Sequence, residues 1–516
     1  MENLFGAVSS ISTNLNHISK EGLPRKIKNL KDRADSGDNA NFAVSLFQEY
    51  LINPNTQIKN FLSNLSETVF DWANNNLYDG YEKMTTAHHG PELFLGFLPK
   101  YIQAFPEEIR SKRLIVEAAQ YIGNWKKKEF EWYDYKNETF KSWYLGSAGL
   151  DTRKVFAYET ADHTRFIHIA LVAWRIEGDN KYFDWALKYG KKIAKKITES
   201  EDIIPVAWGL DGKSYYPEDM KEKTEKFLAA NHHHIMGDPL SGIENLIASG
   251  TLYAFGDLYK LCQENIFKEA AKKIITQLLS CVMNPYADPA PAAISYYRDT
   301  FLDYSFDNKI IEISKNIPPF NTSELTLVFP EKKKIRHPGI GNRKDMIYWQ
   351  FLNEDGTFEI SNEPSTSFFT LIYQITGDIN YADRALTMAA RKLKIAKSIL
   401  RSGYEHADMG CAVCSVSSGH GRNWGIGSIT GCYAPLILGS LENFGSLKSI
   451  INWKSANIAN GCISIVRRLD SNSSELNIIN TSEVNVQTEI TILKSKKDII
   501  LAIEPKSILT KKIINS

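Results

Sequence analysis

Three consecutive histidines follow an asparagine in the run from Asn231 to His234, a few residues ahead of Pro239. Proline suits the first turn of a helix, so the run is expected to lie just before a helix begins. Imidazole can accept or donate a proton near neutral pH, because its ordinary pKa is about 6.5. Neutral imidazoles also bind metal ions. The run is therefore the first candidate for acid–base chemistry, and an exposed polar loop without chemistry is the ordinary alternative.

Other histidines occupy similar positions. His88 and His89 precede an expected helix that starts near residue 92, His163 precedes one at 164, and His420 precedes one near 427. If the first helix of each helical hairpin is the inner one, these histidines all lie near N-terminal ends of inner helices. Parallel inner helices place those ends on one rim, where helix dipoles favour anions. We therefore expect histidines that are distant in the sequence to meet at one mouth.

Two further polar stretches should reach the same rim. The first holds Tyr296, Tyr297 and Arg298, which can offer phenols and a fixed cation. The second, residues 419–425, is rich in glycine, so its backbone can approach a ligand closely. Its tryptophan can stack on a sugar ring, although an aromatic residue is more often part of a core. The residues expected to bind substrate are Tyr296, Arg298, His89, His420, Arg422 and Trp424.

Helical hairpins are the elements expected to position these residues. Apolar residues recur at helical spacing, and short breaks separate the members of each pair. Two of the breaks match closely, since residues 178–187 and 377–386 share Gly, Asp, Tyr, Asp, Ala and Leu at equivalent positions. The glycine can end one helix in the left-handed conformation, and the aspartate can cap the next. The expected pairs are 92–105 with 107–127, 164–176 with 182–197, 241–262 with 267–283, and 364–375 with 381–400, followed by a single helix at 427–441.

The chain of 516 residues divides into three expected parts. Residues 1–40 are polar and form an N-terminal extension, and residues 41–445 form the helical domain. Short segments rich in Ile and Val at 458–466, 476–479, 484–493 and 499–503 predict a small antiparallel β domain over 446–516. Residues 325–360 are strand-like in places and are expected to cross the mouth of the helical domain.

Composition excludes several classes of partner. The formal net charge is +1, from 61 basic and 60 acidic residues, so no global field attracts nucleic acid. No apolar run approaches the ~18 residues of a membrane span. No signal-peptide pattern is visible, which predicts a cytoplasmic protein or a trimmed form of an exported one. Cys411 and Cys414 have the spacing of half a zinc site or of a redox pair, but no second such motif occurs, so structural thiols are expected.

Asparagine, histidine, tyrosine and arginine together suit the cleavage of a uronic-acid glycoside by β-elimination. Such an enzyme neutralises the sugar carboxylate with an amide, imidazole or guanidinium, which makes the C5 proton acidic. A histidine or tyrosine removes that proton, and a tyrosine or histidine protonates the leaving oxygen. The reaction requires no metal or cofactor, and none is expected.

This arrangement resembles that of the (α/α)-toroid polysaccharide lyases that act on alginate, glucuronan or heparin-type chains. Several of them have histidine ahead of an inner helix and a catalytic tyrosine 55–65 residues later, and here 63 residues separate His234 from Tyr297. The resemblance implies a mainly α fold, an (α/α)6-7 toroid of helical hairpins with a small C-terminal antiparallel β domain. It implies an acidic polysaccharide or oligosaccharide as substrate. The resemblance matches Asn231 and one of His232 to His234 with the carboxylate neutraliser and the base, and Tyr297 with the base or acid. The expected catalytic residues are Tyr297, His234, His233, Asn231 and His163.

Other functions remain open. A toroidal glycoside hydrolase needs two carboxyl groups, and an epimerase would use histidines as acid and base. A non-catalytic glycan-binding protein is a different class, although binding alone does not need several titratable groups. A zinc site formed by His163, His232 and His234 is a further alternative. The candidate carboxyl groups for a hydrolase are Asp162, Asp238, Glu244, Asp299 and Asp408.

Overall fold

The structure is a computed structural model, and it describes only part of the chain. The described residues are 56–88, 90–95, 97–126, 130–154, 156–216, 246–247, 249–283, 289–321, 323–328, 348–385, 387–388, 453–455, 462–492 and 497–514. The expected N-terminal extension, the 427–441 helix and the boundary near residue 445 lie outside these ranges.

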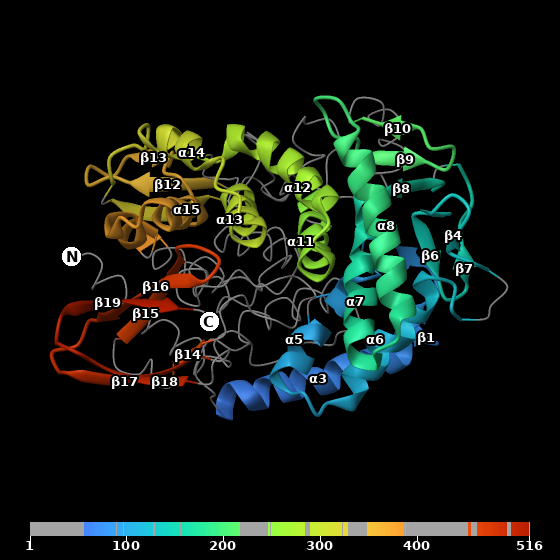
Figure 1. Ribbon diagram of the computed structural model, residues 1–516, viewed down its shortest axis with the longest axis horizontal. Coiled ribbons are helices and arrows are strands. Elements are labelled where there is room, and N and C mark those ends of the chain that lie inside the picture. The colour runs from blue at the N-terminus through green and yellow to red at the C-terminus, as the bar shows by residue number, and fades with distance from the viewer. Residues whose placement is uncertain are drawn as a thin grey trace.

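The helices follow one another along a curved row (Figure 1). Consecutive members of the row pack on each other: α6 on α7, α7 on α8, α8 on α12, α12 on α11 and α13, and α13 on α15. None of the described helices is long and apolar enough to cross a membrane. The bounds are α3 (Thr56–Asn76), α4 (Glu92–Leu95), α5 (Phe97–Ala104), α6 (Ile109–Ile122), α7 (Arg165–Glu177), α8 (Asn180–Thr198), α11 (Thr251–Cys262), α12 (Asn265–Leu278), α13 (Pro289–Phe301), α14 (Asp307–Ser314) and α15 (Thr366–Thr376).

The repeated turn predicted from the sequence is confirmed in both places. Gly178 ends α7 and Gly377 ends α15, each in the left-handed conformation with φ of 73°. The aspartate after each glycine then caps the next helix. Asp179 accepts a hydrogen bond from the backbone N–H of Lys181 at 3.0 Å, and Asp378 accepts one from Asn380 at 2.9 Å. Residues 379–385 are helical again, so the chain forms a hairpin after each of these turns.

The expectation of a mainly α (α/α)6-7 toroid is wrong, because strands occur throughout the described chain and form seven small sheets. Five of these sheets lie ahead of the C-terminal region, between and beside the helices. Connections there carry aromatic and β-branched residues, and pairing in short ladders satisfies their backbone groups. The strands of these five sheets are β1 (Leu77–Tyr78), β2 (Tyr81–Glu82), β3 (Thr85–Thr86), β4 (Tyr133–Asp134), β5 (Thr139–Phe140), β6 (Tyr144–Gly146), β7 (Gly149–Leu150), β8 (Tyr158–Thr160), β9 (Ala207–Gly209), β10 (Ser214–Tyr215), β11 (Glu324–Val328), β12 (Tyr348–Leu352) and β13 (Phe358–Ile360).

The C-terminal strands form two antiparallel sheets, in the orders β14-β17-β18 and β15-β16-β19. Asn477 in β16 donates a hydrogen bond to the Tyr373 hydroxyl of α15 at 2.9 Å, and Arg468 donates to the carbonyl of Asp299 in α13 at 3.1 Å. These bonds join the sheet to the helical row. The strand bounds are β14 (Trp453–Ser455), β15 (Cys462–Arg468), β16 (Ser473–Asn480), β17 (Val486–Ile492), β18 (Lys497–Ile503) and β19 (Ser507–Ile514).

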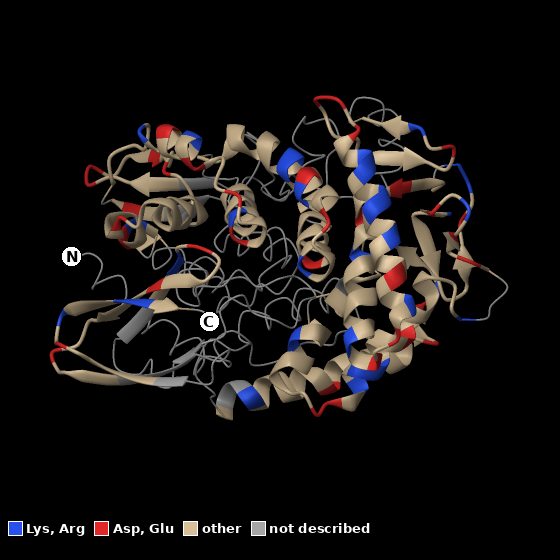
Figure 2. Cartoon of the chain, viewed as in Figure 1, with Lys and Arg blue, Asp and Glu red and all other residues tan. Residues whose placement is uncertain are grey.

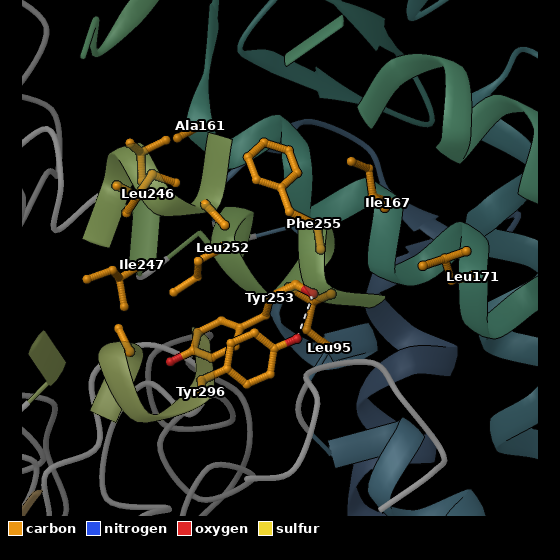
Figure 3. Close-up of a cluster of buried hydrophobic side chains, with 14 of the residues drawn as sticks. Leu95, Ala161, Ile167, Leu171, Leu246, Ile247, Leu252, Tyr253, Phe255 and Tyr296 are labelled. Atoms are coloured by element: carbon orange, nitrogen blue, oxygen red, sulfur yellow. Dashed lines mark hydrogen bonds between the residues drawn. The ribbon is translucent and has the colours of Figure 1, made fainter. Parts of the chain in front are cut away.

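One large buried cluster spans the helices, and the sheet β15-β16-β19 adds Ile465 and Ile479 to it. Figure 3 is a close-up of buried side chains of this kind, among them Ile167 of α7, Phe255 of α11 and Leu95 of α4. All three side chains are buried. Burying such apolar groups is the main favourable term for folding, so this cluster fixes how α4, α7 and α11 sit together.

Candidate functional site

The structure describes only some of the residues that the sequence singles out. His163, Tyr296, Tyr297 and Arg298 are described, as are Asp162 and Asp299. The convergence of the histidine run with Tyr297 therefore stays a prediction. The remaining residues lie outside the described ranges: His89, Asn231, His232, His233, His234, Asp238, Glu244, Asp408, Cys411, Cys414, His420, Arg422 and Trp424.

Tyr297, the expected catalytic phenol, packs inside the row of helices. Its side chain is buried, and its hydroxyl donates a 2.6 Å hydrogen bond to Oδ2 of Asp303. Lys272 reaches the same carboxylate oxygen at 3.2 Å. Burial and the neighbouring carboxylate raise the pKa of Tyr297 above its ordinary value. A phenol that holds its proton this firmly is a poor general acid or base, so its contacts give Tyr297 a structural role.

The side chains of Arg298 and Tyr296 also form contacts within the row of helices. The guanidinium of Arg298 forms a bidentate pair with Asp307, with contacts of 3.0 Å from Nε to Oδ1 and from Nη2 to Oδ2. It also lies over the ring of Tyr304, 4.5 Å from the centroid. Tyr296 is buried, and its hydroxyl donates to the carbonyl of Tyr253 at 3.3 Å, as Figure 3 shows. Neither geometry presents these groups to a substrate.

His163 is fully buried, and both of its ring nitrogens are used. Nδ1 accepts a hydrogen bond from the backbone N–H of Thr160 at 3.1 Å, and Nε2 lies 3.1 Å from the carbonyl of Ser142. Burial lowers the pKa of His163, so the neutral ring is favoured at neutral pH. His163 therefore ties the short helix at 161–164 to the strands beside it, which is a positional role.

A different histidine forms a close pair with a carboxylate. Nδ1 of His88 lies 2.8 Å from Oδ1 of Asp162, and both side chains are buried. The indole Nε1 of Trp143 donates to the other oxygen, Oδ2, at 3.1 Å. A carboxylate can only accept, so His88 donates from Nδ1, and the lone pair of the neutral ring is then on Nε2. This is the arrangement in which a carboxylate orients a histidine base.

Short strand pairing brings these three side chains together. β3 pairs with β6, with Thr86 opposite Tyr144, and the N–H of Ala87 donates to the carbonyl of Trp143 at 2.9 Å. The ladder places His88, which follows β3, beside Trp143, which precedes β6. Asp162 comes from the helical turn between β8 and α7. The sheet that the fold prediction lacked is therefore the scaffold of this pair.

The electrostatic surroundings keep Asp162 ionised. Burial alone would raise the pKa of its carboxyl group. The charge and hydrogen bond of His88, the charge of Arg165 and the bond from Trp143 outweigh burial and hold the pKa of Asp162 well below its usual range. Arg165 also donates to the carbonyl of His88, which places a fixed positive charge beside the pair. An ionised Asp162 accepts the hydrogen bond from Nδ1 of His88, so it fixes which ring nitrogen carries the proton.

A second buried histidine–carboxylate pair lies deeper between α7 and α11. Nε2 of His168 donates to the carbonyl of Gly250 at 2.9 Å, and its Nδ1 lies 3.8 Å from Oδ2 of Asp257. Beside it, the Thr164 and Thr251 hydroxyls form a 2.7 Å hydrogen bond. These contacts cross-link two helices, so His168 is a matched structural counterpart to His88.

Sequence reasoning placed His88 on a rim and Asp162 among the candidate carboxyl groups of a hydrolase, but it did not pair them. They are 74 residues apart, and no local pattern links them. The sequence feature that could have identified both residues is their position, since each comes just before an expected helix.

Metal binding has limited support within the described ranges, where no group of three or more His, Cys, Asp or Glu side chains could hold an ion. The zinc alternative depends on His232 and His234, which lie outside them. No protein-family model matches the chain, and no curated protein matches it.

Proposed function

We propose that the protein is an acid–base enzyme in which His88, oriented by Asp162, removes a proton from a uronic-acid residue of a glycan. The base takes the C5 proton, the C4–O bond breaks, and the leaving oxygen is protonated while the C4–C5 double bond forms. The observation that carries the proposal is the 2.8 Å contact between His88 Nδ1 and Asp162 Oδ1. The class of substrate rests on the resemblance of the sequence to polysaccharide lyases.

The ionised state of Asp162 and the tautomer of His88 support the proposal. An ionised carboxylate beside the imidazole fixes the tautomer with Nε2 as acceptor and stabilises the cation that forms when the base accepts a proton. A base positioned in this way typically contributes about 10²–10⁴-fold to a rate. The guanidinium of Arg165, which donates to the carbonyl of His88, adds a positive charge that helps to keep Asp162 ionised.

The role of Tyr297 in the predicted mechanism passes to His88. His88 also takes the role of base that was predicted for one of His232 to His234, and a histidine of that run protonates the leaving oxygen instead. Asn231 keeps its predicted role in neutralising the carboxylate, while Tyr297 and His163 pack between the helices. Asp162 serves His88, so it is not one of two independent carboxyl groups of the kind a glycoside hydrolase needs.

The test is an absorbance assay over a panel of acidic glycans: alginate, glucuronan and heparin-type chains. We expect at least one of them to give the ultraviolet band of an unsaturated uronate. His88→Gln should abolish the signal, and the matched variant His168→Gln should retain it, because His168 only cross-links helices. Release of reducing sugar without the ultraviolet band would establish a hydrolase instead. Full activity of His88→Gln would remove His88 from the mechanism.

A further inference from the structure

Two lysines of α8 share one buried carboxylate. Nζ of Lys192 lies 2.5 Å and Nζ of Lys196 lies 3.4 Å from the same oxygen, Oε2 of Glu159 in β8. The other oxygen, Oε1, accepts from the Tyr189 hydroxyl at 3.1 Å and from the backbone N–H of Phe140 at 3.2 Å. The glutamate side chain is fully buried. One fully buried negative charge therefore faces two potential cations.

The two lysines are held differently. Lys192 is the closer partner, and it also donates to the carbonyl of Glu138 at 2.5 Å. Lys196 has the longer contact with Glu159, and its Nζ lies 5.2 Å from the ring centroid of Trp208 in β9. Its side chain is 21% exposed, compared with 12% for Lys192. Lys196 is therefore the amine that combines the weaker charge compensation with a path to solvent.

Basic residues dominate the surroundings of this pair. Figure 2 shows them along α8, and Lys273 of α12 donates to the carbonyls of Thr198 and Ser200 just beyond the end of that helix. The other titratable groups that face Glu159 are Tyr133, Tyr189 and His163. Burial, with a smaller contribution from the charge of Lys192, outweighs the attraction of Glu159 and lowers the pKa of Lys196 to about 8. An ordinary lysine has a pKa of about 10.4.

We propose that Lys196 is a reactive lysine that becomes acylated on Nζ by activated acyl donors, namely acyl phosphates and thioesters. The neutral amine attacks the carbonyl carbon and the C–N bond forms. The bond from that carbon to the phosphate oxygen or thiolate sulfur breaks, and the leaving group or water takes the proton. No oxidation or reduction occurs. Acylation removes the charge that Glu159 cannot balance and leaves Lys192 and Glu159 as a one-to-one pair.

The charge balance distinguishes acylation from carbamate formation. A carbamate formed with carbon dioxide would place a second negative charge beside the buried Glu159, and like charges at close range are costly in a poorly solvated site. An amide is neutral, and its methyl group can lie against the ring of Trp208. The observations therefore favour an acyl group.

The experiment treats the full chain with limiting acetyl phosphate at pH 8, and separately with a simple acetyl thioester. Peptide mass spectrometry then measures the labelling rate of each lysine. Lys195 is the internal control, because it lies next to Lys196 on α8 but is 68% exposed and pairs with the exposed Glu199 at 3.7 Å. We expect Lys196 to acquire label about 10-fold faster than Lys195, because burial lowers the pKa of the Lys196 amine to about 8. Equal or slower labelling of Lys196 with both donors would overturn the proposal.

A variant tests the cause of the reactivity. In Lys192→Met, Lys196 no longer shares the Glu159 carboxylate with a second lysine. Its charged form is then better compensated, so its labelling rate should fall toward that of Lys195. An unchanged rate in folded Lys192→Met would refute the shared-carboxylate account. The comparison of Lys196 with Lys195 needs no variant, so it stands even if Lys192→Met fails to fold.

Discussion

Gly178 and Gly377 occupy equivalent turns almost two hundred residues apart, and both adopt φ of 73°. Each donates its N–H to a carbonyl of the helix that it ends, Trp174 for Gly178 and Tyr373 for Gly377. The sequence repeat at these positions is therefore a repeat of one piece of backbone geometry. Their surroundings differ, because only Gly377 has the guanidinium of Arg467 packed against it.

This difference predicts unequal effects of the same substitution. Gly178→Ala should lower the free energy of unfolding by about 1–2 kcal/mol, because only the left-handed backbone penalises the new methyl group. Gly377→Ala should cost more, because a Cβ there would lie 2.5 Å from Nη1 of Arg467 and must displace it. Urea unfolding of both variants measures the two losses. Equal losses would show that the Arg467 contact with the turn is unimportant.

Tyr297→Phe removes a hydrogen bond to a carboxylate that keeps its contacts with Lys272 and Ser305. We expect a loss of about 1.5 kcal/mol in unfolding free energy, at the lower end for a bond to a charged group. Catalytic turnover should be retained, since the hydroxyl of Tyr297 is bonded to Asp303. Tyr296→Phe is the matched control and should cost less, because its bond to a neutral carbonyl is longer, at 3.3 Å. Loss of turnover in Tyr297→Phe with an intact fold would restore its catalytic role.

Asp162→Asn tests the orientation of His88. The amide offers a donor as well as an acceptor and carries no charge, so it no longer fixes the tautomer of the ring or stabilises the imidazolium. On a glycan that the wild type cleaves, we expect kcat to fall at least about 10²-fold, with a smaller change in KM. Added imidazole should partly rescue His88→Gly and should not rescue Asp162→Asn. A variant Asp162→Asn with wild-type kcat would show that the carboxylate has no part in catalysis.

The lowered pKa of Lys196 has a consequence for stability. Between pH about 8, its folded value, and about 10.4, its ordinary value, the unfolded chain binds more protons at this residue than the folded protein does. Its contribution to stability therefore rises with pH across that window. The unfolding free energy of wild type minus that of Lys196→Met should increase from pH 8 to pH 10. A flat or falling difference would show that Lys196 keeps an ordinary pKa in the folded protein.

The sequence by itself determined the local features. The helix ends at Gly178 and Gly377 and the caps at Asp179 and Asp378 follow from backbone sterics and side-chain reach, which act over a few residues. Four of the six C-terminal strands were also visible, because segments rich in Ile and Val favour strands locally. β14 and β19 were not predicted.

Only the tertiary structure decided which distant groups meet. The two-residue strands such as β3 and β6 are too short to leave a pattern in the sequence, yet they bring His88 to Trp143 and Asp162. The fold prediction failed at the same point, because such ladders form only when the helices around them hold the two segments together. Tertiary packing likewise set the partners of Tyr297 and His163, since composition reveals that a side chain can titrate but not which groups surround it.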